Sequence, residues 1–234
     1  MLVALAFALT PPHRAHAASG IGVTPVLLEM PVAKGVGSLR IDNGRFVPAA
    51  FEVEAYRWTQ EDGRDVLTRT RDLVAAPSVF EVGPAQRQII RLALATHVRS
   101  ATTAHAFRLI VRELPAAARS GNGPTILLEF SVPVFPVTQD AAARFVARDL
   151  GQGRVALINT GNAYARLLEV GPAGASMAGV PRYMLPGASV VRPFNAFHGG
   201  LRLVTSGPGG MDIHEQVIPV ASALLAGDPV LRGR

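Results

Sequence analysis

The longest regular pattern in the chain is the run from residue 124 to residue 137, where apolar side chains occupy every second position. Because successive side chains of a strand point to opposite faces, these residues would form one row about 30 Å long at ~3.3 Å per residue. Strands of ~5–6 residues are more common. The run therefore predicts an unusually long strand with one apolar face. The row consists of Ile126, Leu128, Phe130, Val132 and Val134.

Pro133 lies inside this run. Proline has no amide hydrogen to donate, so within a sheet it belongs on an edge strand or at a bulge. A long apolar edge strand is an aggregation hazard unless it serves to pair with another chain. Two interpretations follow: a core strand of a β-sandwich with one internal proline, or an edge strand that pairs with a partner. The run alone leaves both open.

The chain from Ile21 up to this run has an all-β pattern. Short runs rich in Val, Ile, Leu and Phe are separated by Gly, Asn, Asp and Pro, and none has the apolar period of a helix. Pro25 makes the first strand an edge strand or one that switches sheets, and Asp62-Gly63 predicts a hairpin turn. About seven strands is the number in an immunoglobulin-like sandwich. The predicted strands are 21–28, 38–42, 51–59, 66–68, 76–84, 88–93 and 107–113.

A second set of strands follows the polar, small-residue segment Thr138 to Ala143, which we interpret as a hinge. We expect two immunoglobulin-like β-sandwich domains, at 18–137 and 138–221. The tail 222–234 is short and broken by Gly and Pro, so we expect it to add no element and to be disordered. The strands predicted for the second domain are 154–158, 163–170, 183–185, 189–192, 201–205 and 213–220, with a turn at 159–162.

The first 17 residues have features of a signal peptide. An apolar block at 2–9 precedes Ala15-His16-Ala17, which has the small-x-small form of a signal-peptidase site, so we expect cleavage after Ala17. The positively charged leading region is missing, so either the true signal starts earlier or the likeness is accidental. Eight apolar residues cannot span a bilayer, and no later run approaches membrane length. We expect an exported mature chain without membrane insertion.

Composition and motifs argue against several functions. The 234 residues include no cysteine, which excludes a disulfide framework and thiolate chemistry. The net charge of +6 comes from scattered arginines without the patch that nucleic-acid binding requires. No histidine spacing indicates a metal site, and the glycine-rich segment 151–156 is followed by a predicted strand, so we interpret it as a turn. We therefore expect no enzyme, cofactor or nucleic-acid partner.

Four stretches together resemble the periplasmic chaperones of chaperone–usher pilus assembly. Their order along the chain is more specific than any one of them. They are the Pro-x-x-Phe-x-Val-x-Pro segment 77–84 with Ile90-Arg91-Leu92, the strand from Phe107 through Arg112-Glu113-Leu114-Pro115, the alternating strand 126–134, and the weaker pair Asn159-Thr-Gly-Asn162 and Leu185-Pro186-Gly187. The short connection 116–123 is similar to the short-loop or archaic branch of the family.

The resemblance implies two immunoglobulin-like domains in a boomerang arrangement, located in the periplasm. It also implies that the last strand of the first domain lends its apolar row to a pilus or fimbrial subunit that lacks a strand, before delivery to an outer-membrane usher. The implied donor residues are Ile126, Leu128, Phe130 and Val132.

The sequence departs from the family at the carboxylate anchor. Many such chaperones hold the terminal carboxylate of the subunit with two basic residues, but Leu27 and Pro133 occupy those positions here. Either another arginine binds the subunit carboxylate, or main-chain pairing and apolar burial are enough to bind the subunit. The residue that anchors the carboxylate is therefore unassigned. Two alternatives to a chaperone stay open: an exported structural or adhesive β-sandwich module, and an exported enzyme whose site is assembled only in three dimensions.

Overall fold

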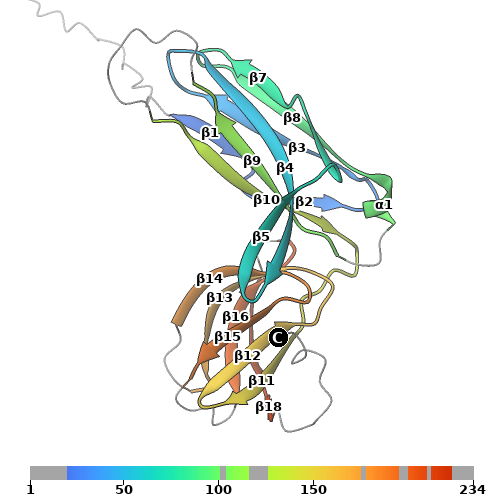
Figure 1. Cartoon of the computed structure of the whole chain (residues 1–234), viewed down its shortest axis with the longest axis vertical. Coiled ribbons are helices and arrows are strands. Elements are labelled where there is room, and N and C mark those ends of the chain that lie inside the picture. The colour runs from blue at the N-terminus through green and yellow to red at the C-terminus, as the bar shows by residue number, and fades with distance from the viewer. Residues whose placement is uncertain are drawn as a thin grey trace, which may run out of the picture.

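Strands form nearly all the regular structure in the described part of the computed structural model, in two sandwiches that meet end to end at an angle (Figure 1). The structure describes residues 20–100, 104–115, 126–174, 178–194, 200–209 and 212–222. The expected signal peptide 1–17, the connection 116–123 and the tail beyond residue 222 lie outside the described residues. The predicted all-β class with two immunoglobulin-like sandwiches is confirmed.

Two sheets form the first sandwich. Sheet A has the order β1 (Ile21–Thr24), β3 (Val36–Asn43), β8 (Arg87–Leu94) and β6 (Leu73–Ala76). Sheet B has the order β2 (Leu28–Pro31), β10 (Glu129–Val137), β9 (Phe107–Glu113), β4 (Ala49–Glu61) and β5 (Arg64–Arg69), and β7 (Val79–Val82) also pairs with β4. The short helix α1 (Thr96–Arg99) follows β8.

The first predicted strand, 21–28, switches sheets at Pro25, as expected. Its first half, β1, pairs with β3 in sheet A, whereas β2 pairs in parallel with the end of β10 in sheet B. The Asp62-Gly63 hairpin is confirmed as well, because both residues adopt the left-handed backbone, with φ of 49° and 71°. The first chain segment therefore covers only one end of β10.

Alternation along the strands builds the core of the first sandwich. On β9 the inward residues are Phe107, Leu109 and Val111, each 0% exposed, and outward residues alternate with them. Burying one large apolar side chain fully contributes roughly 1.5–3 kcal/mol, so these contacts can stabilise a domain without disulfides. The other wholly buried side chains in this core include Met30, Leu39, Ile41, Phe51, Leu73, Ile90 and Val134.

Two further four-stranded sheets form the second sandwich. Sheet C has the order β15 (Ser189–Pro193), β12 (Arg154–Asn159), β11 (Phe145–Gly151) and β18 (Val220–Ser222). Sheet D has the order β14 (Ala178–Met184), β13 (Ala165–Pro172), β16 (Leu201–Ser206) and β17 (Ile213–Ile218). The sequence pattern did not predict β11 or β18. Within the glycine-rich segment 151–156, residues 152 and 153 form the turn between β11 and β12, as predicted, and residues 154–156 already belong to β12.

The segment between β10 and β11 contains the predicted hinge, but hydrogen bonds hold it to the second sandwich. The Ala142 amide donates to Asn162 Oδ1 at 2.8 Å, and the Asn162 amide donates to the Ala142 carbonyl at 3.0 Å. The predicted turn 159–162 therefore fixes the connection. The domain boundary between residues 137 and 138 stays a prediction.

An aromatic cluster joins the two sandwiches. Phe135 of β10 stacks on Tyr164, with ring centroids 3.6 Å apart, and Trp58 of β4 meets Tyr183 edge-on at 5.6 Å. Trp58 is 2% exposed and is part of the buried core of this cluster. The β4–β5 hairpin also reaches the second sandwich (Figure 1), where Gln60 accepts a hydrogen bond from the Leu185 amide.

Candidate functional site

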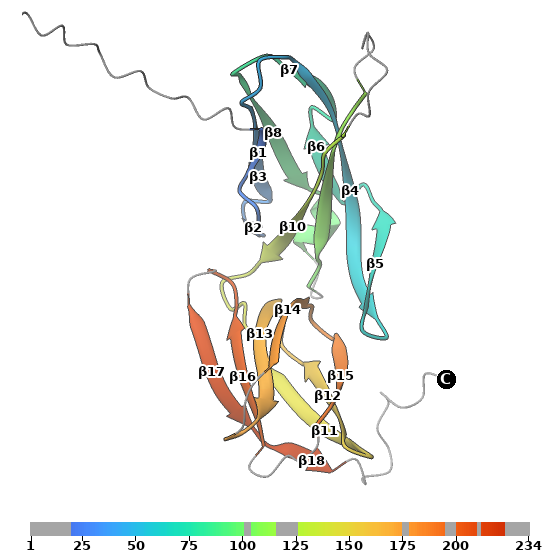
Figure 2. The same ribbon diagram turned by 90° about the vertical axis from the view of Figure 1, so that its left-hand side faces the viewer.

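Strand β10 has one partly open edge. Its residues 129–134 pair with β9, and its residues 134–137 pair with β2 on the other side. Figure 2 shows β2 beside only the end of β10 that faces the second sandwich. Within the described part of the chain, residues 129–133 therefore have no strand on the side opposite β9. Pro133 lies in this unpaired stretch, although β10 as a whole lies between β2 and β9 in the sheet.

The direction of the backbone groups follows from one hydrogen bond. The Glu113 amide donates to the Leu128 carbonyl at 2.8 Å, so these two residues form a hydrogen-bonded pair. Hydrogen-bonded and non-hydrogen-bonded pairs alternate in an antiparallel ladder. The backbone groups of Glu129 and Ser131 consequently face the open edge. Pro133 has the same parity as Glu129 and Ser131. The open edge therefore lacks one hydrogen-bond donor at Pro133, whereas the hydrogen bonds between β10 and β9 are unaffected.

The apolar row begins just before β10 and continues along its inner face, and the burial of its side chains increases in that direction. Ile126 is 82% exposed, Leu128 and Phe130 are half-buried, and Val132 is 2% exposed. Phe130 packs against the core of its own sandwich, and Val132 is part of that core. The strand also begins at residue 129, rather than at 126 as predicted. The apolar surface that a partner could reach therefore lies at the start of the row.

The outer face of the same strands is charged. Arg112 Nε donates to Glu129 at 2.6 Å, and Arg112 Nη1 donates to Glu54 at 2.5 Å. Arg69 contacts the other Glu54 oxygen at 2.5 Å. Burial alone would raise the pKa of Glu54, but hydrogen bonds from Tyr56 and Arg112 and the two arginine charges lower it below its usual value. The two faces of β10 thus have opposite character.

Neither of the two positions expected to anchor the subunit's terminal carboxylate carries a basic side chain. Leu27 packs against the aromatic cluster between the sandwiches, and Pro133 is buried. Arg108 of β9 lies directly opposite Pro133, and its guanidinium carbon is 3.8 Å from the centre of the Trp58 ring. Burial lowers the pKa of Arg108. Sequence reasoning missed Arg108, because only the strand register brings it beside Pro133.

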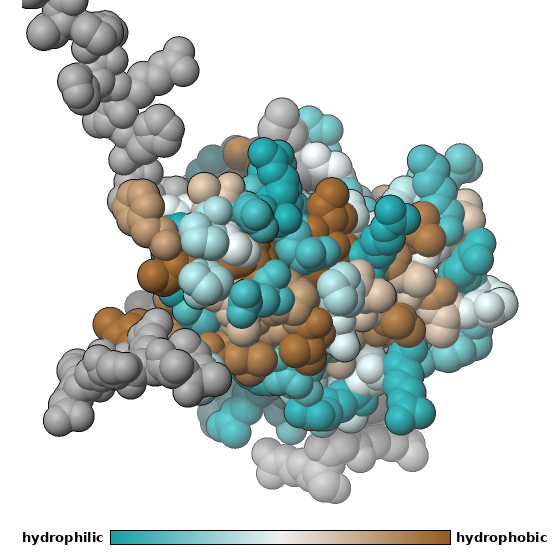
Figure 3. Space-filling model, turned by 90° about the horizontal axis from the view of Figure 1, so that it is seen from above, coloured by the Kyte–Doolittle hydropathy of each residue, from teal (hydrophilic) through white to brown (hydrophobic). Residues whose placement is uncertain are grey.

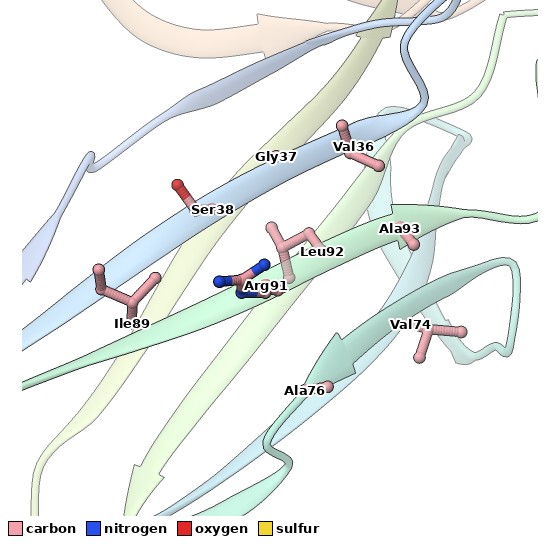
Figure 4. Close-up of a pocket in the computed structure, with 9 residues that line it drawn as sticks. All are labelled: Val36, Gly37, Ser38, Val74, Ala76, Ile89, Arg91, Leu92 and Ala93. Atoms are coloured by element: carbon pink, nitrogen blue, oxygen red, sulfur yellow. The ribbon is translucent and has the colours of Figure 1, made fainter.

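The outer face of sheet A carries an apolar groove of about 650 Å³ (Figure 4). Val36, Val74 and Ile89 line it from three strands and are 59%, 53% and 52% exposed. Arg91 also lines the groove. The sequence pattern does not reveal this surface, since each strand contributes only one or two exposed apolar residues and only the sheet brings them together.

The distal end of the first sandwich also shows hydrophobic residues among hydrophilic ones (Figure 3). Phe46 and Val47, in the loop between β3 and β4, are 84% and 54% exposed. In the described residues no three His, Cys, Asp or Glu side chains are grouped to hold a metal ion. Nor is any described helix long and apolar enough to cross a membrane.

Comparison with known proteins identifies the family. The model of the pili and flagellar-assembly chaperones, for the PapD N-terminal domain, matches residues 20–137. The chain belongs to this family, and the resemblance seen in the sequence is confirmed. Family and fold are those of chaperones that are not enzymes. No curated protein sequence matches the chain.

Several solved structures share the fold over nearly their whole length. One chain of the CsuC–CsuE chaperone–tip adhesion subunit complex, from the archaic chaperone–usher Csu pili of Acinetobacter baumannii, is 15% identical with a TM-score of 0.68, over 86% of this chain and 99% of that one. The Escherichia coli chaperone DraB is 14% identical with a TM-score of 0.64, over 85% and 96%. A chain of the Salmonella enterica SafA pilin–SafB chaperone complex is 14% identical with a TM-score of 0.59, over 85% and 96%.

Proposed function

We propose that this protein is a periplasmic chaperone that binds pilus or fimbrial subunits by donor-strand complementation and delivers them to an outer-membrane usher. Its action is binding, with no catalytic step and no cofactor. Several of the similar structures are complexes of a chaperone with a pilin or tip subunit, which supports a subunit as the partner.

The observation that carries the proposal is the partly open edge of β10. A subunit strand placed in line with β2 would meet the free backbone groups of Glu129 and Ser131. Its own apolar side chains would then cover Ile126, Leu128 and Phe130. Each side chain that becomes fully buried contributes roughly 1.5–3 kcal/mol. Association costs several kcal/mol in lost freedom of motion, so the whole row is needed.

Delivery to an usher requires a second surface that stays free while a subunit is bound. The groove lined by Val36, Val74 and Ile89 lies on the outer face of sheet A, whereas the open edge belongs to sheet B. Exposed apolar patches of this kind mark protein interaction sites. We therefore assign the groove to the usher.

The test is co-purification of a subunit with variants of the chaperone. Ile126→Asp places a charge in the apolar contact, where an unpaired charge is costly, so we expect recovery of the subunit to fall more than tenfold. Because Ile126 is 82% exposed, the free chaperone should melt as the wild type does. Glu129→Gln changes the outer face of the same strand and should leave recovery within about twofold.

Phe130→Asp extends the test into the half-buried part of the row, with a thermal melt of the free protein as its control. Wild-type recovery of the subunit by Ile126→Asp would overturn the donor-strand proposal. The strand would then serve only its own sandwich, as in a structural or adhesive module, an interpretation that the burial of Val132 favours.

A further inference from the structure

Glu113 is the one inward-facing charged residue of β9. It follows Phe107, Leu109 and Val111 on the face of the strand that forms the core, and its side chain is 3% exposed. A carboxylate taken out of water at this depth is costly unless it is paired and hydrogen-bonded. The carboxylate of Glu113 therefore requires charged or hydrogen-bonding partners inside the sandwich.

Arg45 pairs with this carboxylate through two contacts. Its Nη1 donates to Glu113 Oε1 at 2.5 Å, and its Nη2 donates to Oε2 at 3.1 Å. Paired contacts of this kind combine charge with a fixed geometry. The loop that carries Arg45 is itself held by the buried Asn43, whose side chain accepts from the Arg45 amide and donates to the Val47 and Val82 carbonyls.

The same carboxylate binds the backbone at the start of the apolar row. The Glu113 amide donates to the Leu128 carbonyl at 2.8 Å, and a regular ladder would return the bond from the Leu128 amide to the Glu113 carbonyl. Instead, the Leu128 amide donates to Glu113 Oε2 at 3.2 Å. The side chain thus takes the place of the last ladder acceptor, just before β10 begins at residue 129.

We propose that Glu113, held by Arg45, is a positioning residue that fixes the start of the donor row. The inference rests on the proposed function. Leu128 belongs to the row, and the orientation of its backbone determines where the exposed Ile126 points. If the segment around Leu128 is already ordered in the free chaperone, less conformational entropy is lost when the subunit binds, and the affinity is higher. Arg45 and Glu113 thereby tie the loop between β3 and β4 to the site.

Two measurements test the proposal: amide hydrogen exchange at Leu128 in the free chaperone, and the affinity for a purified subunit. Glu113→Ala removes the acceptor, and we expect Leu128 to exchange roughly tenfold faster and the affinity to fall about tenfold. Glu113→Gln keeps an oxygen for the Leu128 amide and should restore much of both. Glu129→Ala is the matched control, since its carboxylate pairs with the Arg112 side chain on the opposite face.

The result that overturns the proposal is an unchanged affinity in Glu113→Ala, whether or not Leu128 exchanges faster. Exchange at Leu128 that accelerates equally in Glu129→Ala would overturn it too. Should Glu113→Ala fail to fold, Arg45→Gln keeps the acceptor but removes the paired contacts that hold it, and we expect faster exchange at Leu128 and a lower affinity for the subunit there too. Ile126→Asp separates the two ideas: if it loses the subunit while Glu113→Ala does not, only the positioning role is wrong, and if neither loses the subunit, the proposed function is wrong.

Discussion

The carboxylate of Glu29 in the first sandwich accepts a hydrogen bond from the Tyr164 hydroxyl of the second, with 2.5 Å between the oxygens. The Gly209 amide, also in the second sandwich, donates to both Glu29 oxygens at 2.9 Å and 3.0 Å. Glu29 lies in β2, the strand that covers the end of β10. One side chain therefore links the joint between the domains to the boundary of the open edge.

Tyr164→Phe tests this link. The variant keeps the ring stacked on Phe135 but loses a hydrogen bond to a charged group, so we expect a loss of about 1.5–3 kcal/mol in the free energy of unfolding at neutral pH. Denaturant unfolding measures it. A loss below the error of that measurement would mean that water replaces the hydroxyl without cost.

The same residue should govern alkaline stability. Burial and the hydrogen bond to Glu29 raise the pKa of Tyr164 far above its usual range. A raised pKa in the folded state gives stability that is complete below the unfolded pKa of about 10 and is lost as the pH rises towards the folded value. We expect the wild type to lose stability more steeply than Tyr164→Phe between about pH 9.5 and 11. Equal slopes would contradict this assignment.

Because burial increases along the apolar row, substitutions at its two ends should affect different properties of the protein. Val132→Ala removes buried methyl groups and should lower the free energy of unfolding by about 2 kcal/mol. Ile126→Ala removes exposed ones and should change it by less than about 0.5 kcal/mol, while lowering subunit recovery. Melting and co-purification of both variants give the comparison, and a stable Val132→Ala would show that the end of the row is looser than the structure indicates.

The buried Asn159 should contribute strongly to the second sandwich. Its side chain makes four hydrogen bonds, two accepted from the Arg144 and Gly161 amides and two donated to the Ala163 and Met184 carbonyls. Asn159→Ala leaves several of these groups without a partner, so we expect a loss of about 3 kcal/mol or more in denaturant unfolding. Asn162→Ala, in the same turn but exposed, should cost less than about 1 kcal/mol. Equal costs would contradict the role of burial.

Alternation in the sequence was enough to predict most of the first sandwich. Phe51 and Val53 alternate with charged residues along β4, and Asp62-Gly63 ends that strand with the turn its chemistry favours. The pattern failed for β11, where Phe145 and Ala147 face the core but Asp149, the next residue of the same parity, interrupts the apolar spacing. That strand is stabilised by its pairing with β12, which a local pattern cannot reveal.

The candidate site was predictable only in part, for a similar reason. The apolar row could be predicted because the alternation of apolar and polar residues can be read directly from the sequence. Ile126 and Val132 look alike in that row, yet only Val132 belongs to the core, which it shares with Met30 of β2 and Leu109 of β9. Their different burial therefore depends on packing between strands, which parity does not reveal. The bond from Leu128 to Glu113 and the place of Arg108 beside Pro133 likewise require the register of β9 against β10.

Glu54 should make the protein sensitive to acid. Hydrogen bonds and arginine charges outweigh burial and lower its pKa below the usual value of about 4.3. A lowered pKa in the folded state gives stability that is present above the unfolded pKa and is lost as the pH falls through the folded value. We expect the free energy of unfolding to fall between about pH 5 and 3, and less steeply in Glu54→Gln. Tyr56→Phe removes one hydrogen bond to the same carboxylate, at 2.9 Å, and should be intermediate. An acid slope in Glu54→Gln equal to that of the wild type would place the acid sensitivity elsewhere in the fold.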